Sequence, residues 1–175
     1  MAYEGFVFPS GVDSASLPSC MFTEASPKIS AALRQYYKDG RFSDIVVVTE
    51  DRTRLKCHRV VLACNSTKLD EALAEEDFPH GSELVLKGVE SAALEAIIAY
   101  FYAGSIHITV PLSLPILAGA VKLDVSGLQS AVHSFVAQIL AREPGLLVAF
   151  MEQSTSLNLD TMTESLLTYS AARWE

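Results

Sequence analysis

The sequence predicts an α+β fold in which one small sheet is flanked by a cluster of α-helices. Ile45 to Val48 is an unbroken β-branched run, which suits a strand covered on both faces and is too short for an independent helix. After a turn at Asp51-Arg52, Arg54 to Cys57 alternates polar with apolar residues, as a half-exposed strand does. Most of the remaining apolar residues recur at helical spacing, which predicts that helices form the larger part of the fold.

The expected elements follow from this periodicity together with turn and cap residues. Strands are expected at residues 45–48, 54–57, 83–87 and 106–110, the last ended by Pro111. Helices are expected at residues 27–38, 58–64, 67–74, 91–103, 114–123, 126–141, 146–153 and 161–173. The second of these helices contains Val60, Val61 and Leu62.

Length and composition favour one domain with surface left over for association. A chain of 175 residues is long enough to bury a sizeable core. Half of the residues are hydrophobic and 19% are charged, so apolar area remains for an oligomer. The net charge of -8 opposes both the phosphate backbone and anionic lipid, and we therefore expect no nucleic-acid or membrane partner.

The cysteines indicate a reducing compartment. Cys20, Cys57 and Cys64 are odd in number and lack C-x-x-C spacing, which is not the pattern of a secreted disulfide framework. The N-terminus has no basic region followed by an apolar run, and no apolar stretch reaches the roughly 20 residues that span a bilayer. We expect an intracellular protein, cytoplasmic or nuclear.

No arrangement of residues predicts catalysis or a cofactor. Neither G-x-x-x-x-G-K-[ST] nor G-x-G-x-x-G nor G-x-S-x-G occurs. Cys57, His58, Cys64 and His80 contain metal-ligand atoms, but the two cysteines fall on a strand and on a core helix, where small buried apolar residues are the simpler interpretation. We expect no metal and no enzyme activity; a small enzyme with an unrecognised site is the rival class.

Two segments together resemble one known family. Phe42-Ser43-Asp44-Ile45-Val46-Val47-Val48, followed ten residues later by His58-Arg59-Val60-Val61-Leu62-Ala63-Cys64, is similar to the BTB/POZ domain, in which an aspartate opens an apolar strand and a His-Lys/Arg-x-x-Leu-Ala helix follows. The similarity continues at Leu84 to Val89 and at Leu94 to Gly104. It departs where the family has Ser-x-x-Phe and this chain has Asn65-Ser66-Thr67-Lys68-Leu69, and where Tyr-Thr-Gly becomes Tyr102-Ala103-Gly104.

The resemblance implies a BTB/POZ fold with a small mixed sheet, and it suggests three divisions of the chain. Residues 1–25 are expected to be a flexible segment, in which Tyr3 to Phe8 can add an edge strand. Residues 26–142 are expected to form the BTB/POZ domain. Residues 143–175 resemble, by helical pattern and position, the helical extension that follows this domain in adaptors of cullin ubiquitin ligases.

The helix at residues 27–38 is open to two interpretations. Ile29, Leu33, Tyr36 and Tyr37 recur at helical spacing, and the pattern alone favours a helix that covers its own core. In the BTB/POZ family the corresponding helix packs across a two-fold axis. The resemblance therefore implies a homodimer whose interface includes these four residues.

Asp44 and Arg59 are the polar pair of most interest. Each borders an apolar segment, where a charge is costly unless it is paired and hydrogen-bonded. In BTB/POZ domains the matching residues lie in a charged pocket near the dimer boundary. We expect the two side chains to form a structural ion pair, with a peptide-binding role as the alternative.

The resulting expectation is a protein–protein interaction module that homodimerises through its BTB/POZ domain. The alternative is a substrate adaptor of a cullin-RING ubiquitin ligase, which the helical extension supports. Such adaptors often show a hydrophobic-x-acid sequence late in the central helix. This chain has Ile97-Ile98-Ala99 there, so Ile97 and Ala99 are the candidate cullin contacts and the acid is missing.

Overall fold

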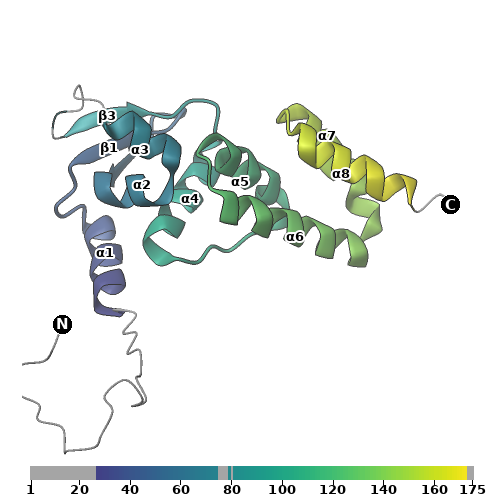
Figure 1. The fold of residues 1–175 in the computed structure, drawn as a ribbon, viewed down its shortest axis with the longest axis horizontal. Helices are drawn as coiled ribbons and strands as arrows, with labels where there is room; N and C mark the ends of the chain where they lie inside the picture. Colours follow the sequence, from purple (N-terminus) through teal and green to yellow (C-terminus); the bar gives the residue numbers. More distant parts are fainter. Residues whose placement is uncertain (1–26, 75–78, 80, 173–175) are drawn as a thin grey trace, which may run out of the picture.

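The computed structural model describes residues 27–74, 79 and 81–172, and it is an elongated α+β arrangement. Figure 1 shows the sheet and helix α1 at one end and helices α7 and α8 at the other. The elements in chain order are α1 (Pro27–Asp39), β1 (Ile45–Val48), β2 (Arg54–Cys57), α2 (Arg59–Asn65), α3 (Thr67–Ala74), β3 (Ser82–Val85), α4 (Ser91–Ala103), α5 (Val110–Lys122), α6 (Ser126–Arg142), a 3-10 turn (Pro144–Leu146), α7 (Leu147–Ser156) and α8 (Asp160–Ala171).

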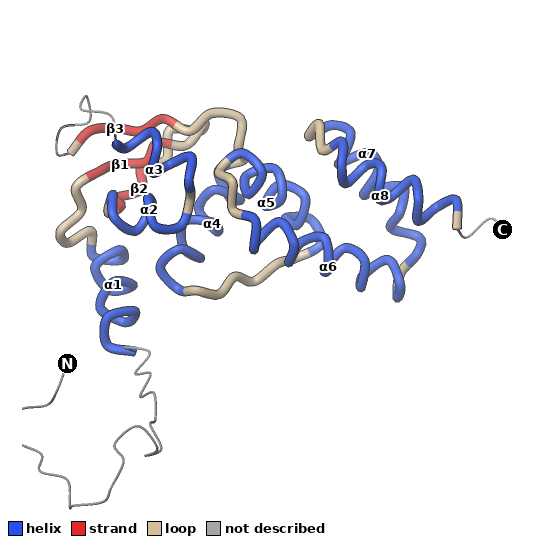
Figure 2. The backbone as a smooth tube through the Cα atoms, viewed as in Figure 1, coloured by secondary structure: helices blue, strands red, loops and turns tan. Residues whose placement is uncertain are grey.

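The sheet is small and mixed, as the resemblance implied, and β1 is its central strand. The strand order is β2-β1-β3, with β1 antiparallel to β2 and parallel to β3. Figure 2 shows the strands confined to one end of the chain, while the rest is helical. Ile45 and Val47 of β1 belong to the hydrophobic core, which continues through α2, α3 and α4 to residues of α7 and α8.

Two glycines allow close packing at positions where a side chain does not fit. Gly40 ends α1 with φ +64, and a Cβ there would lie 2.7 Å from Lys56 Cδ on β2. On α5, a Cβ at Gly119 would lie 2.5 Å from Ile97 Cδ1 of α4. The first glycine brings α1 close to the sheet, and the second brings the two central helices together.

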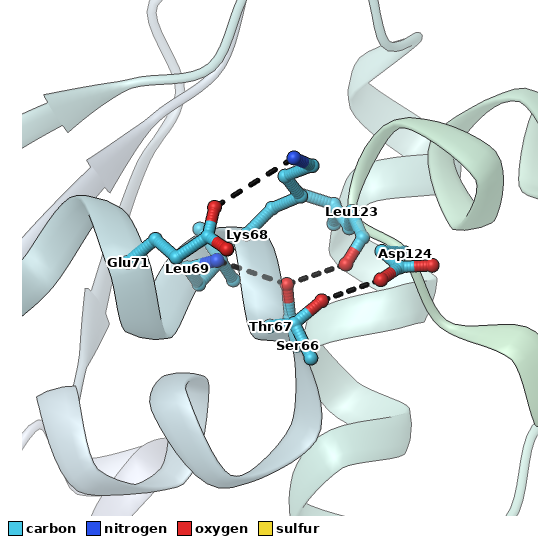
Figure 3. Close-up of polar contacts among 7 residues, drawn as sticks. All are labelled: Ser66, Thr67, Lys68, Leu69, Glu71, Leu123 and Asp124. Atoms are coloured by element: carbon cyan, nitrogen blue, oxygen red, sulfur yellow. Dashed lines mark hydrogen bonds and ion pairs between the residues drawn. The ribbon is translucent and has the colours of Figure 1, made fainter.

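The corner between α2 and α3 is tied to the corner between α5 and α6 (Figure 3). The Ser66 hydroxyl accepts the Leu69 N–H at 3.1 Å, which caps α3, and donates to the Leu123 carbonyl. Next to it, the Thr67 hydroxyl donates to the Asp124 carboxylate. Asp124 has φ +54, a conformation that aspartate tolerates better than most residues. These bonds fix the first helical pair against the second.

The C-terminal helices pack on the same core as the sheet. Phe150 of α7 and Met162 of α8 are buried in the common hydrophobic cluster. The Tyr169 hydroxyl donates to the Leu140 carbonyl at 2.8 Å and so joins α8 to α6. The Gln153 amide donates to the Pro111 carbonyl at 3.2 Å and joins α7 to the start of α5.

The strand predicted at residues 106–110 is wrong. Residues 105–109 form no regular structure, and α5 begins at Val110, four residues before the predicted helix. Pro111 lies in the first turn of α5, where its missing N–H needs no partner and its fixed φ suits a helix. The alternation of Ile106 and Ile108 instead places two partly buried side chains against the core.

The packing of α2 corrects one further prediction. Val60 is exposed, and the inward positions of this helix are Val61 and Leu62. Cys64 was expected to be a small buried residue, but its place in the last turn of α2 leaves it exposed. A helix of one and a half to two turns can bury only one stripe, and Val61 and Leu62 occupy it. Cys57 is buried on the inner side of β2, as predicted.

Several predictions fall outside the described residues. These are the flexible segment at residues 1–25 with its edge strand, Cys20, and His80. The division between a domain at 26–142 and an extension at 143–175 stays a prediction.

Folding stability is expected to decline at alkaline pH. Burial raises the pKa of the Cys57 thiol from 9.0 to about 12. Between these values the unfolded chain binds fewer protons than the folded chain, so the free energy of unfolding falls by about 1 kcal/mol per pH unit. Burial also raises the pKa of Tyr37 to about 12, which steepens the decline above its ordinary value of 10.0. Urea unfolding between about pH 8 and about pH 10.5 measures this slope.

The matched control uses the two described cysteines. Cys57→Ala removes the buried thiol and is expected to make the decline shallower, whereas Cys64→Ala alters an exposed residue and is expected to keep the wild-type slope. Equal slopes in all three proteins would contradict the assignment to Cys57.

Candidate protein-interaction surface

Helix α1 is held on the core by one side only. Leu33 and Tyr37 are partly buried and pack against the core. The Tyr37 ring stacks on the Tyr102 ring of α4, with centroids 4.4 Å apart and planes 12° from parallel. In Figure 1 the rest of the helix projects away from the helical cluster. One stripe of α1 is therefore used within the chain, and its other side faces outward.

A buried hydrogen-bond network behind this stack involves Tyr102 and His58. The Tyr102 hydroxyl accepts the His58 N–H at 2.9 Å and lies 2.8 Å from His58 Nδ1, while His58 Nε2 lies 2.8 Å from the Arg41 carbonyl. A carbonyl can only accept, so Nε2 carries the ring proton and donates it, and the tyrosine hydroxyl donates to Nδ1. The network uses every polar atom of the imidazole. It fixes the loop after α1, and burial raises the pKa of the Tyr102 hydroxyl above its ordinary value.

The outward side of α1 continues into an exposed aromatic cluster. Ile29 is 62% exposed and Phe42 is 67% exposed. The Tyr36 and Phe42 rings meet edge to face with centroids 5.0 Å apart, and the Arg41 guanidinium lies 5.2 Å from the Phe42 ring centroid. Phe42 has φ +60, which costs a residue with a Cβ about 1–2 kcal/mol. The fold thus holds a large apolar ring in solvent in an unfavourable backbone conformation.

The exposed Val60 lies close in sequence to the same junction. It is 64% exposed at the start of α2. This end of α2 is anchored to the Arg41–Asp44 loop, since His58 bonds to the Arg41 carbonyl and the Arg59 N–H bonds to the Asp44 carboxylate. We call Ile29, Tyr36, Phe42 and Val60 the α1 face.

The structure thus divides the predicted interface residues into two pairs. Leu33 and Tyr37 serve the core, while Ile29 and Tyr36 lie toward the exposed side. Sequence reasoning missed Phe42 and Val60. The signal for Phe42 was an aromatic residue two positions after Gly40, outside any periodic segment, and nothing in the pattern showed its positive φ. The order of Val60, Val61 and Leu62 in the sequence did not show which of them is exposed.

Asp44 and Arg59 are brought together, but the contact differs from the ion pair that was expected. Asp44 Oδ1 accepts the backbone N–H of Arg59 at 2.8 Å, at the first turn of α2. The Arg59 guanidinium donates to the Leu73 carbonyl at the end of α3. The Asp44 backbone also bonds on both sides, to the Cys57 carbonyl at 3.2 Å and to the Gly81 N–H at 2.7 Å. Asp44 therefore joins β1, β2, β3 and α2.

The two candidate cullin contacts differ in accessibility. Ile97 has no exposed surface, because its side chain lies in the hydrophobic core between α4 and α5. Ala99 is exposed on the same helix. Within this chain, only Ala99 of the pair is open to a partner, and a cullin role for either residue stays a prediction.

A groove separates the start of α5 from α7. It has a volume of about 480 Å³ and is lined mainly by apolar groups of Val110, Pro111, Leu146, Ala149 and Phe150, with Glu152 and Gln153 at its polar side. The hydrogen bond between Gln153 and the Pro111 carbonyl crosses it. The groove lies where the predicted helical extension meets the preceding helices.

In the described part of the chain, no group of three or more His, Cys, Asp or Glu side chains is placed to hold a metal ion. Nor does any helix there have both the length and the apolar character needed to cross a bilayer.

Comparison with known proteins assigns the chain to one family. A family described as the BTB/POZ domain matches residues 33–140, which is more than half of the chain. The chain belongs to the BTB/POZ family. Members of this family are protein–protein interaction modules, and this is the coarse function of the chain.

Individual relatives and a solved structure agree with this assignment. Kelch-like protein 38 of Danio rerio is 30% identical over 143 residues, which make up 81% of this chain and 24% of that protein. BTB/POZ domain-containing protein 19 of Homo sapiens is 31% identical over 113 residues, or 63% of this chain and 39% of that protein. The chain thus spans less than half of either relative. The BTB domain of zebrafish PATZ1 shares the fold, with a TM-score of 0.60 and 18% identity over 70% of this chain and 99% of that one.

The Asp44 contact predicts a specific pattern of stability losses in this BTB/POZ domain. Asp44→Ala leaves the Arg59 N–H without its acceptor and is expected to lower the free energy of unfolding by about 1–3 kcal/mol. Arg59→Gln keeps that N–H, so the loss caused by Asp44→Ala should be nearly the same in the Arg59→Gln background. Urea unfolding of both single variants and the double variant measures this, with the exposed Glu164→Ala as a control. A coupling of about 1 kcal/mol or more would show that the two side chains act as an ion pair instead.

Proposed function

We propose that this chain is a homodimerising interaction module and that the α1 face forms the two-fold interface. The observation that carries the proposal is the set of exposed Ile29, partly buried Tyr36 and exposed Phe42, next to the stripe of α1 that is fixed to the core. Membership of the BTB/POZ family supports it, since the corresponding helix of the family packs across a two-fold axis.

The physical argument concerns apolar area and strain. Phe42 and Val60 are each more than 60% exposed, and covering such side chains contributes on the order of 25 cal/mol for each apolar Å². In a two-fold interface each residue of the face is buried twice, once in each protomer. Obligate dimers bury about 2,000 Å² or more in total, so the interface would have to extend from the α1 face over the adjacent loop and the start of α2. The positive φ of Phe42 is explained if the ring is positioned for a partner.

The choice of test residues follows from the two sides of α1. A charge at Leu33 or Tyr37 would damage the packing of the helix on its own core, so loss of a dimer in those variants would be ambiguous. Phe42 and Val60 contribute to the surface without being core residues. Substitutions there test the interface with little effect on the fold.

Light scattering coupled to size exclusion is expected to give twice the 19.0 kDa chain mass for the wild type at micromolar concentration. Phe42→Glu combined with Val60→Glu places like charges across the axis and is expected to give the monomer mass with wild-type helicity. Leu167→Glu is the matched control, because Leu167 is also an exposed apolar residue, 49% accessible, but lies on α8. It should remain dimeric. A wild-type mass of one chain at tens of micromolar would refute the homodimer.

A second function, that of a cullin-RING adaptor, is favoured by the groove between α5 and α7. Its apolar lining and its volume of about 480 Å³ suit an apolar peptide segment. Ala99 provides no carboxylate, so we expect weaker than micromolar binding in calorimetric titration with the N-terminal domain of the cognate cullin. Submicromolar binding that is lost in Ala149→Glu, which fills the groove with a charge, would establish the adaptor function.

A further inference from the structure

The sheet has a second face that the core does not use. Side chains alternate along a strand, so Ile45 and Val47 of β1 point to the core and Val46 and Val48 point to the opposite side. The register places Val46 opposite Lys56 and Glu83, and Val48 opposite Arg54 and Val85. We call these six residues, Val46, Val48, Arg54, Lys56, Glu83 and Val85, the outer face.

On the outer face, the three valines form an apolar surface, which we call the valine floor, and one ion pair crosses it. Val48 is buried, yet it is not part of the hydrophobic core cluster. Arg54 on β2 and Glu83 on β3 form an ion pair of 2.6 Å, and since β1 lies between these strands, the pair passes over the valines. Val85 beside it is 51% exposed. An exposed β-branched residue at the end of a valine row leaves part of this floor open to solvent.

Two hollows meet on this side of the sheet. One, of about 650 Å³, is lined by residues that include Val48, Val85, Arg52 and Lys87. The other, of about 410 Å³, lies between the end of α1 and β2 and is lined by Lys38 and Lys56 among others. Arg54 lines both, and we call the two neighbouring hollows together the depression.

The charges around the depression are unevenly matched. Its five cations are Lys38, Arg52, Arg54, Lys56 and Lys87, and its three acids are Asp39, Glu50 and Glu83. All three acids are engaged: by the Gln35 amide, the Gly88 N–H and Arg54, respectively. Among the described residues, the side chains of the other four cations have no hydrogen bond or ion pair. Within the described part of the chain, every acid of the depression thus has a partner, and four of its five cations have none.

This imbalance runs against the charge of the chain as a whole. The net charge is -8, yet this depression carries two more cations than acids, the difference between five and three. Positive groups gathered around an apolar floor favour a ligand that supplies both carboxylates and apolar side chains. An extended peptide does so on the scale of a strand, since its side chains alternate in direction every residue.

We propose that the outer face binds an extended acidic segment of a partner protein, with apolar residues of the segment on Val48 and Val85 and its carboxylates at Arg52 and Lys87. This surface is separate from the α1 face and does not depend on the homodimer. A nucleic acid is the less suitable ligand, because its phosphates would use the cations but would leave Val48 and Val85 without an apolar partner.

Fluorescence anisotropy of the full chain tests the proposal with synthetic probes. The main probe is a labelled peptide of about 12 residues that alternates Glu and Val, a length that covers the four-residue strands with a margin. A Glu-Ser peptide tests the valine floor, a Lys-Val peptide tests the sign of the charge, and a single-stranded oligothymidine tests the nucleic-acid alternative. We expect saturable binding of the Glu-Val peptide that weakens between about 0.05 M and about 0.5 M salt, and weaker or no binding of the other three.

The variants compare exposed cations of the depression with exposed cations elsewhere on the chain. Arg52→Glu with Lys87→Glu is expected to weaken Glu-Val binding about tenfold or more. The matched control, Lys68→Glu with Arg142→Glu, reverses two exposed charges on α3 and α6 and should change it by about twofold or less. Val85→Ser tests the floor without charge and should weaken binding of the Glu-Val peptide but not of the Glu-Ser peptide. Equal losses in the two double variants, tighter binding of the oligonucleotide, or no saturable binding of the Glu-Val peptide would each overturn the proposal.

Discussion

The Tyr102 hydroxyl is the contact on which the interaction end of the molecule depends. It bonds to the backbone and ring of His58, whose other ring nitrogen bonds to the Arg41 carbonyl, and its ring stacks on Tyr37. Through these contacts one side chain of α4 positions α1, the loop that carries Phe42, and the junction of β2 with α2. A buried donor left without a partner costs about 1–3 kcal/mol, so these elements are constrained together.

This constraint separates the surfaces from which function follows. Because Tyr37 and Leu33 are held by the core, the adjoining stripe of α1, with Ile29 and Tyr36, is presented together with Phe42 as an apolar face. Gly40 lets α1 approach β2 closely, so the end of the same helix borders the charged depression on the outer face of the sheet. The groove between α5 and α7 lies in the other half of the chain. The α1 face, the depression and the groove are therefore three separate surfaces of this BTB/POZ chain.

Much of the fold was predictable from local pattern, and the surfaces were not. The β1 run, the α3 segment and the helix closed by Gly104 carry strong periodicity or cap residues, and their bounds agree with the structure closely. The segment at 106–110 failed because alternation cannot show whether a neighbouring strand exists and because Pro111 suits a helix start as well as a strand end. Asp44 was predicted to pair with the Arg59 side chain, but it accepts the Arg59 backbone N–H, a partner that no sequence pattern displays. The cations of the depression come from separate segments, namely the end of α1, the β1–β2 turn, β2 and the residues after β3, which only the fold brings together.

Hydrogen exchange of Tyr102→Phe, followed by mass spectrometry, tests the central claim most directly, with Tyr100→Phe as the matched control. Removing the Tyr102 hydroxyl is expected to speed exchange together in α1, in the Arg41–Asp44 loop and at the start of α2, while α7 and α8 keep wild-type protection. Tyr100→Phe should change none of these segments. Wild-type protection throughout α1 and the β2–α2 junction in Tyr102→Phe, or equal loss of protection across the whole chain, would contradict the account.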